Sequence, residues 1–124
     1  MFDNQAVLVA FIAAKDLTVA RSFYAGTLGL EVESEDSFAL VCKANGTTLR
    51  IQKVDALTPQ VFTVLGWTVP SVAAAVDALA QRGVAFERYE GMPQDERGIW
   101  TAPGGTRVAW FKDPHGNTLS LSGG

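Results

Sequence analysis

The side chains best suited to chemistry are few, and two of them stand alone. His115 is the only histidine and Cys42 is the only cysteine. A histidine can act as a general base or a metal ligand, and a cysteine becomes a nucleophile when a neighbour lowers its pKa. His115, however, lies inside the turn-forming stretch Asp113-Pro-His-Gly-Asn117, and no histidine is usefully spaced from Cys42. We therefore interpret His115 as a turn residue and Cys42 as an inert strand residue.

Arg50 is the charged side chain with the clearest potential for binding. Its neighbours Leu49 and Ile51 are apolar, so strand alternation directs Arg50 to the opposite face. A planar guanidinium suits a carboxylate or phosphate clamp. A salt bridge or an exposed edge position fits the same pattern, and these interpretations stay open.

The three tryptophans offer large apolar area and faces for stacking. Trp110 lies two positions after Val108, on the same face of the strand, and should line a pocket. Trp100 lies in a long connection, where it could form a lid or a dimer contact. Trp67 has the opposite parity in its strand, and we expect it to pack against a helix.

A repeated hairpin should position these residues. Residues 108–121 read as strand, turn and strand, and residues 38–51 echo them. A shift of 70 positions (116 − 46 = 70) aligns three pairs: Gly46 with Gly116, Thr48 with Thr118, and Leu49 with Leu119. The lysines of the two stretches miss alignment by one residue. The same shift gives two further pairs: Leu40 with Trp110, and Arg50 with Ser120. Such a repeat indicates a duplicated unit.

Each half of the chain reads as strand, helix, strand and hairpin. The first-half elements are expected at residues 6–14, 17–25, 30–33, 38–43 and 47–53. The second half is expected to hold a strand at 61–69, a helix at 72–82, a strand at 84–89, a connection at 90–105 and the second hairpin. Asp16 and Ser71 are candidate helix N-caps, and Asn45-Gly46 is a strong hairpin turn. Module one then spans about residues 5–53, a linker 54–60, and module two about 61–122.

Composition limits the class of protein. The chain has 124 residues, 48% of them hydrophobic and 19% charged, which predicts one globular domain. Its net charge is −3 and it has no basic run, so nucleic acid is not an expected partner. No signal peptide or membrane span is predicted, and a single cysteine fits a reducing cytoplasm. We therefore expect a cytoplasmic protein without a membrane partner.

Two motifs resemble the vicinal oxygen chelate superfamily, which includes glyoxalase I, bleomycin resistance proteins and extradiol dioxygenases. They are Asp16-Leu-x-x-Ala-x-x-Phe-Tyr24 followed by Leu28-Gly-Leu30, and Phe111-Lys-Asp-Pro-His-Gly-Asn117. The resemblance implies an α+β fold of two βαβββ modules that form a curved mixed sheet around a cleft, usually in a homodimer. The modules could pair within one chain or swap between two.

The resemblance also locates the positions where the family's enzymes hold a divalent metal on His and Glu side chains. Here those positions read Val9, Arg50, Val64 and Ser120. Valine has no donor atom, arginine carries a positive charge, and a lone serine hydroxyl is a poor ligand. We therefore expect neither a metal nor another cofactor.

The expected function is metal-independent binding of an apolar or aromatic small molecule, similar to the bleomycin resistance branch. The ligand-binding residues are expected to be Phe11, Leu40, Val64, Trp100 and Trp110, with Arg50 and Ser120 as polar anchors. One alternative is a glyoxalase- or dioxygenase-like enzyme with a metal at other positions or with metal-free chemistry supported by Arg50. A third is an assembly or regulatory module whose cleft is filled by its own side chains.

Overall fold

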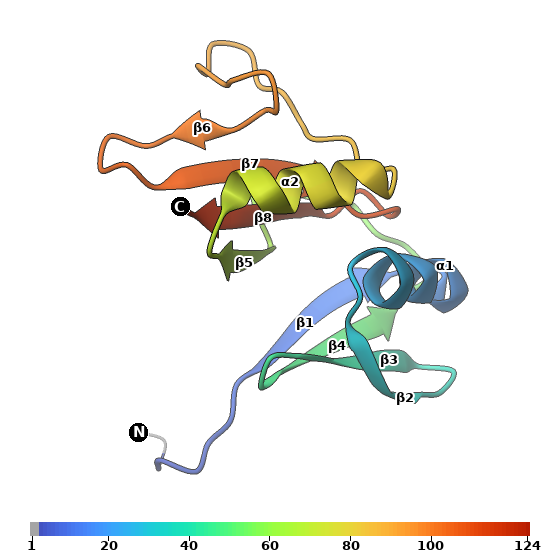
Figure 1. Cartoon of the computed structure of the whole chain (residues 1–124). Helices are drawn as coiled ribbons and strands as arrows, with labels where there is room; N and C mark the ends of the chain where they lie inside the picture. Colours follow the sequence, from blue (N-terminus) through green and yellow to red (C-terminus); the bar gives the residue numbers. More distant parts are fainter. Residues whose placement is uncertain (1–2) are drawn as a thin grey trace. The chain divides into compact units, whose positions relative to one another are not determined.

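The computed structural model describes residues 3–124, and it divides into two compact units, Met1–Leu57 and Thr58–Gly124. Each unit holds a four-stranded mixed sheet with a helical segment against one face (Figure 1). The order of elements in each unit is strand, helix and three strands. This confirms the predicted α+β fold of two βαβββ modules, and the unit boundary falls inside the predicted linker at residues 54–60.

The first unit has the strand order β1-β4-β3-β2, in which β1 runs parallel to β4 and the other pairs are antiparallel. Its elements are β1 (Val9–Ala14), α1 (Leu17–Arg21), the π-helix η1 (Ser22–Thr27), β2 (Glu31–Glu35), β3 (Ala39–Ala44) and β4 (Thr47–Lys53).

Local sequence signals explain where the elements of the first unit begin and turn. Asp16 caps α1, because its carboxylate accepts hydrogen bonds from the backbone N–H groups of Thr18 and Val19, at 2.9 and 3.2 Å. Asn45 and Gly46 both have positive φ, 50° and 90°, as a two-residue hairpin turn requires. Both predictions from sequence are confirmed.

The second unit has the strand order β5-β8-β7-β6, in which β5 runs parallel to β8. Its elements are β5 (Leu65–Val69), α2 (Val72–Gln81), β6 (Trp100–Thr101), β7 (Arg107–Lys112) and β8 (Thr118–Gly123). The hydroxyl of Ser71 accepts from the N–H of Ala74 and caps α2, as predicted. The helix packs on β7 and β8, which leaves the other face of this sheet free of helix.

Two strand predictions in the second unit are wrong. Residues 61–64 are exposed and form no strand, so β5 begins only at Leu65. Residues 84–89 form no strand; they contact β7 through a bridge between Phe86 and Phe111, while Trp100 and Thr101 pair with the other end of β7. The segment around Phe86 and the short strand β6 therefore pair with the same edge of β7. The pattern of apolar and polar residues within either segment could not reveal this shared pairing.

The helices do not include a membrane-crossing candidate. Within residues 3–124, no helix is long and apolar enough to span a bilayer.

Candidate functional site

The helix-free face of the second sheet is built from alternate residues of three strands. Trp110 on β7 lies in register with Ser120 on β8, and Ser120 lies in register with Gly66 on β5. Residues in register share a face of a sheet. Their chain neighbours, such as Phe111 and Leu119, are fully buried beneath α2, so the row from Gly66 to Trp110 faces outward.

This face steps from small residues to large ones. A Cβ placed on Gly66 would lie 2.4 Å from Oγ of Ser120, so the Ser120 hydroxyl occupies the space that any larger side chain would need. On the β5 and β8 side of the face the side chains are therefore small, and one of them carries a hydroxyl. Trp110 stands next to it in the row and is only half-buried.

Three aromatic rings meet on the β7 side of this face, where the side chains are large. The ring centroids of Tyr89 and Trp110 are 5.5 Å apart with planes at 80°, and those of Trp100 and Trp110 are 6.2 Å apart with planes at 33°. Trp110 is fixed further because its indole N–H donates to Oγ1 of Thr63 at 3.1 Å. We refer to Tyr89, Trp100 and Trp110 as the aromatic cluster. All three rings are partly exposed, so they present stacking surface.

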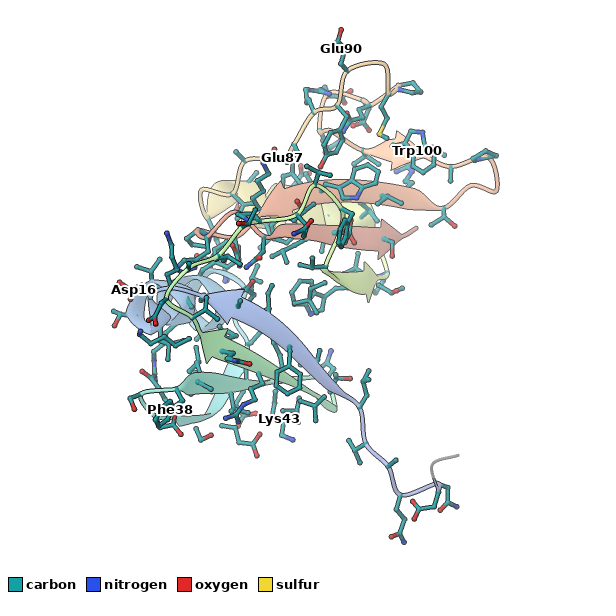
Figure 2. All side chains as sticks on the ribbon, turned by 180° about the vertical axis from the view of Figure 1, so that it is seen from behind. Asp16, Phe38, Lys43, Glu87, Glu90 and Trp100 are labelled. Carbon is teal, nitrogen blue, oxygen red and sulfur yellow. The ribbon has the colours of Figure 1, made fainter. Side chains whose placement is uncertain are left out.

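The charge next to the aromatic cluster is negative but partly neutralised. Desolvation, with a smaller contribution from the Glu87 carboxylate, raises the pKa of the Tyr89 hydroxyl. Tyr89 therefore stays protonated and can donate a hydrogen bond at neutral pH. Nζ of Lys112 lies 3.6 Å from the Glu87 carboxylate, and its positive charge partly neutralises the negative charge of Glu87. Figure 2 places Glu87 and Trp100 on the same unit, on the two chain segments that border β7.

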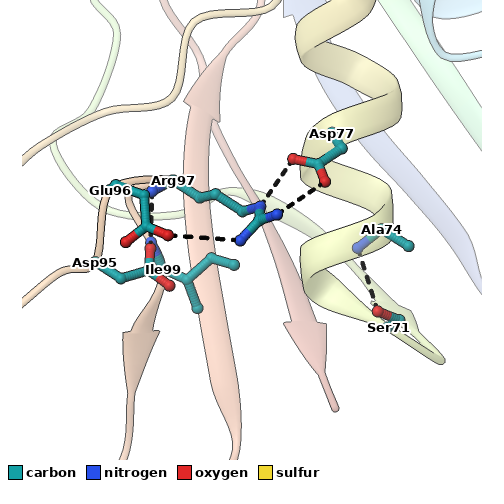
Figure 3. A network of polar contacts seen from close by, with 7 residues as sticks. All are labelled: Ser71, Ala74, Asp77, Asp95, Glu96, Arg97 and Ile99. Atoms are coloured by element: carbon teal, nitrogen blue, oxygen red, sulfur yellow. Dashed lines mark hydrogen bonds and ion pairs between the residues drawn. The ribbon is translucent and has the colours of Figure 1, made fainter.

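The segment between the cluster's two outer rings is tied to α2. Nε and Nη2 of Arg97 donate to the two carboxylate oxygens of Asp77 on that helix, at 2.8 and 3.2 Å (Figure 3). This hydrogen bonding lowers the pKa of the Asp77 carboxyl. The pair is exposed, so its role is to restrain the segment rather than to build a buried site.

The structure brings several predicted site residues of the second unit together. Trp100 and Trp110 are in ring contact, and Ser120 lies beside Trp110 across the sheet. Val64 is 39% exposed and joins the edge of the same sheet, because its N–H donates to the backbone oxygen of Thr118. Trp67 lies in register with buried Leu121, on the face of the sheet that α2 covers; that it packs against the helix stays a prediction.

Tyr89 is the member of the aromatic cluster that the sequence interpretation missed. It ends the stretch that was predicted as a strand, and it has no motif of its own. The only available signal for Tyr89 was that it lies two positions after Glu87 and so shares its face of the chain. The N–H of Glu87 donates to the backbone oxygen of Trp110. That signal becomes informative only when the pairing with β7 is known.

The prediction that Leu40 lines the pocket is wrong. Leu40 is fully buried and lies in register with Ile51, on the face that α1 covers. The residue in register with Arg50, and therefore equivalent to Trp110, is Val41. The cause is the turn length: the register pair Lys43 and Thr48 is five positions apart, whereas Lys112 and Thr118 are six apart. One extra residue in the second turn shifts the repeat and exchanges the two faces.

Arg50 and Phe11 form a separate surface in the first unit. They lie in register on β4 and β1, and Phe11 is 59% exposed. Within residues 3–124, no carboxylate lies at ion-pair distance from Arg50. The positive charge of Arg50 acts weakly on the carboxyl of Asp36. The pKa of that carboxyl is lowered mainly by hydrogen bonds from the backbone N–H groups of Phe38 and Ala39, and only slightly by Arg50. An anion clamp at Arg50 stays a prediction.

The four residues that the resemblance predicts at the family's metal positions do not have the side chains to bind a divalent cation. Val9 and Arg50 lie on the first sheet, and Val64 and Ser120 lie at the second. Together they offer two apolar side chains, one cation and one hydroxyl, which is not a donor set for a hard or borderline metal ion. In the part of the chain that the structure describes, no three His, Cys, Asp or Glu side chains gather into a possible ligand group.

Comparison with known proteins gives a consistent result. A crystal structure from Sphaerobacter thermophilus of a Glyoxalase/bleomycin resistance protein/dioxygenase superfamily member has a TM-score of 0.73 and 25% identity, covering 96% of this chain and 97% of that one. Lactoylglutathione lyase from Agrobacterium tumefaciens has a TM-score of 0.70 and 20% identity, over 97% and 94%. The oxidase ChaP-H2 has a TM-score of 0.67 and 24% identity, over 98% and 95%.

No curated protein matches the chain significantly. The family model described as Glyoxalase/Bleomycin resistance protein/Dioxygenase superfamily matches residues 6–121. With its βαβββ modules and its Asp113–Asn117 turn, the chain belongs to the Glyoxalase/Bleomycin resistance protein/Dioxygenase superfamily.

Proposed function

We propose that this protein binds a small planar aromatic molecule, without a metal, on the helix-free face of the second sheet. The observation that carries the proposal is the step from Gly66 and Ser120 up to the aromatic cluster. A flat ligand laid over this row meets only the small hydroxyl of Ser120 beside Gly66, while its edge or face contacts the indole of Trp110.

The chemistry of this face suits stacking combined with a few directional polar contacts. Apolar burial contributes roughly 25 cal/mol per Å² before the costs of association. The hydroxyl of Ser120 can donate to or accept from a polar group on the ligand. The protonated Tyr89 hydroxyl supplies a second donor. Such a site binds and orients a ligand, and the proposal needs no catalytic step.

Planarity should therefore control affinity. We expect 2-naphthol to bind more tightly than decahydro-2-naphthol by about tenfold, because only the aromatic molecule can lie flat and stack, a difference of about 1.4 kcal/mol. Isothermal titration calorimetry with both compounds measures this directly, since they share a carbon skeleton and a hydroxyl. Equal affinities would contradict a stacking site.

The alternative proposal is an enzyme related to the lyase or the oxidase among the structural neighbours. Its support is the shared fold alone, because the family's metal positions read Val9, Arg50, Val64 and Ser120. Arg50 is the residue that would stabilise developing negative charge in metal-free chemistry. Turnover of an aromatic substrate that Arg50→Ala abolishes, with the Trp110 face unchanged, would favour this alternative.

A homodimer is the assembly that we propose, with the cytoplasm as its location. The dimer is supported by exposed apolar side chains in and before the edge strand β1: Val7 and Leu8 are each 73% exposed and Phe11 is 59% exposed. We expect light scattering after size exclusion to give about twice the 13.2 kDa chain mass. Leu8→Lys should weaken the assembly, and a monomer across all concentrations would contradict it.

A further inference from the structure

The aromatic cluster depends on a loop, because two of its three rings sit where that loop begins and ends. Tyr89 precedes residues 90–99 and Trp100 follows them. We refer to residues 90–99 as the ring loop. An unrestrained loop of this length would let the two rings turn independently of Trp110, so something must fix its two ends together.

Gln94 makes that connection with a single side chain. Its Oε1 accepts from the backbone N–H of Tyr89 at 2.7 Å. Its Nε2 donates to the backbone oxygen of Glu87 at 3.0 Å and to that of Gly98 at 2.8 Å. Its backbone also forms a bridge with Trp100. One amide therefore links the chain before the ring loop to Gly98 near the end of that loop, and the backbone bridge of the same residue reaches Trp100.

The packing around Gln94 shows that this link is close. Gly98 is buried with φ of +86°, and a Cβ on it would lie 3.5 Å from both the backbone oxygen of Glu87 and Cβ of Phe86. The N–H of Glu87 donates in turn to the backbone oxygen of Trp110 at 2.8 Å. A continuous set of hydrogen bonds therefore runs from Gln94 through Glu87 to β7.

Other bonds also restrain the ring loop, among them those from the backbone N–H groups of Arg97 and Ile99 to Oδ1 of Asp95. The restraint that ties the loop to α2 is of a different kind. Arg97 pairs with Asp77 on α2 and also contacts Glu96, and both side chains of the Arg97–Asp77 pair are exposed (Figure 3). Exposed ion pairs hold weakly because water and salt screen them. The half-buried amide of Gln94 touches the backbone at Tyr89 itself, so this bond acts directly on a ring-bearing residue.

We propose that Gln94 is the positioning residue of the aromatic cluster. Its side-chain bonds hold Tyr89 against Trp110 and fix the end of the ring loop at Gly98. With that end fixed, the backbone bridge of Gln94 holds Trp100 in place. Gln94 thereby sets the width and tilt of the stacking surface. The part of this inference that concerns ligand affinity rests on the proposed function, whereas the part that concerns ring geometry does not.

The test substitutes Gln94→Met, which keeps the side-chain length and removes all three bonds. The first readout is the indole N–H resonances of the ligand-free protein. Those of Trp100 and Trp110 should shift, and that of Trp67, on the opposite face, should not. The second readout is calorimetric affinity for 2-naphthol, which should weaken by about tenfold, as expected when a binding surface loses its geometry.

Three further variants make the test specific. Gln94→Glu keeps the bond to the Tyr89 N–H and loses both donations, so it serves if Gln94→Met does not fold, and it should also shift the Trp100 resonance. Asp77→Asn weakens the exposed restraint, and Gln81→Ala removes an exposed amide at the end of α2. Both should leave the indole resonances and the affinity unchanged.

The outcomes separate the two proposals. Unchanged indole resonances in Gln94→Met, or equal shifts in Asp77→Asn, would overturn the positioning role. Shifted resonances with no 2-naphthol binding by any variant, the unsubstituted protein included, would overturn the proposed function and support the positioning role. Shifted resonances with weakened binding support both.

Discussion

Trp110→Ala should weaken binding of 2-naphthol by about a hundredfold while the protein remains folded. Truncating an aromatic anchor at a binding surface costs roughly 2–4 kcal/mol, and each 1.4 kcal/mol is a factor of ten. Trp110 touches both other rings of the aromatic cluster, so its loss removes the centre of the stacking surface. The fold should survive because Trp110 is half-buried on an open face, whereas its neighbour Phe111 is in the core.

Two controls isolate the ring from general damage. Trp110→Phe keeps a stacking face but loses the donation to Thr63, so we expect it to recover most of the affinity. Trp67→Phe alters a tryptophan on the helix-covered face of the same sheet and should leave the affinity unchanged. Calorimetry with 2-naphthol, with thermal unfolding on each variant, measures both quantities. Full affinity in a folded Trp110→Ala protein would remove this face from the site.

Features encoded within a few residues were predictable from the sequence. The helix caps at Asp16 and Ser71 and the turn at Asn45-Gly46 depend on side-chain oxygens and on backbone angles that few other residues adopt. The outward face of Trp110 and the helix-side face of Trp67 followed from alternation within single strands. Each of these inferences uses local geometry alone.

The errors came from relations between distant segments. Leu40 was assigned by projecting the second hairpin onto the first, and one additional turn residue was enough to reverse its face. Tyr89 was missed because its importance depends on residues 86–87 pairing with β7, more than twenty positions away. Strand alternation defines two faces but not which partner lies alongside, so register errors of one residue are costly.

The turn at Asp113 fixes that register in the second unit, and its loss should strongly destabilise the fold. Oδ1 of Asp113 accepts from the backbone N–H groups of His115 and Asn117, at 2.9 and 3.0 Å, and Oδ2 accepts from Nδ2 of Asn117 at 2.8 Å. Both Asp113 and Asn117 are 5% exposed. Hydrogen bonds to a buried charged group are individually strong, and their donors cannot turn to water when the acceptor is removed.

Asp113→Ala should therefore lower the free energy of unfolding by about 3 kcal/mol, measured by urea denaturation. Asp36 provides a matched control, because its carboxylate accepts from the N–H groups of Phe38 and Ala39, at 2.8 and 2.9 Å, in an exposed turn of the first unit. Asp36→Ala breaks the same kind of bond where water can replace it, so its effect should be clearly smaller. Equal losses in the two variants would show that burial adds nothing at Asp113. A larger loss at Asp113, accompanied by weaker 2-naphthol binding, would show that the turn also keeps Trp110 opposite Ser120.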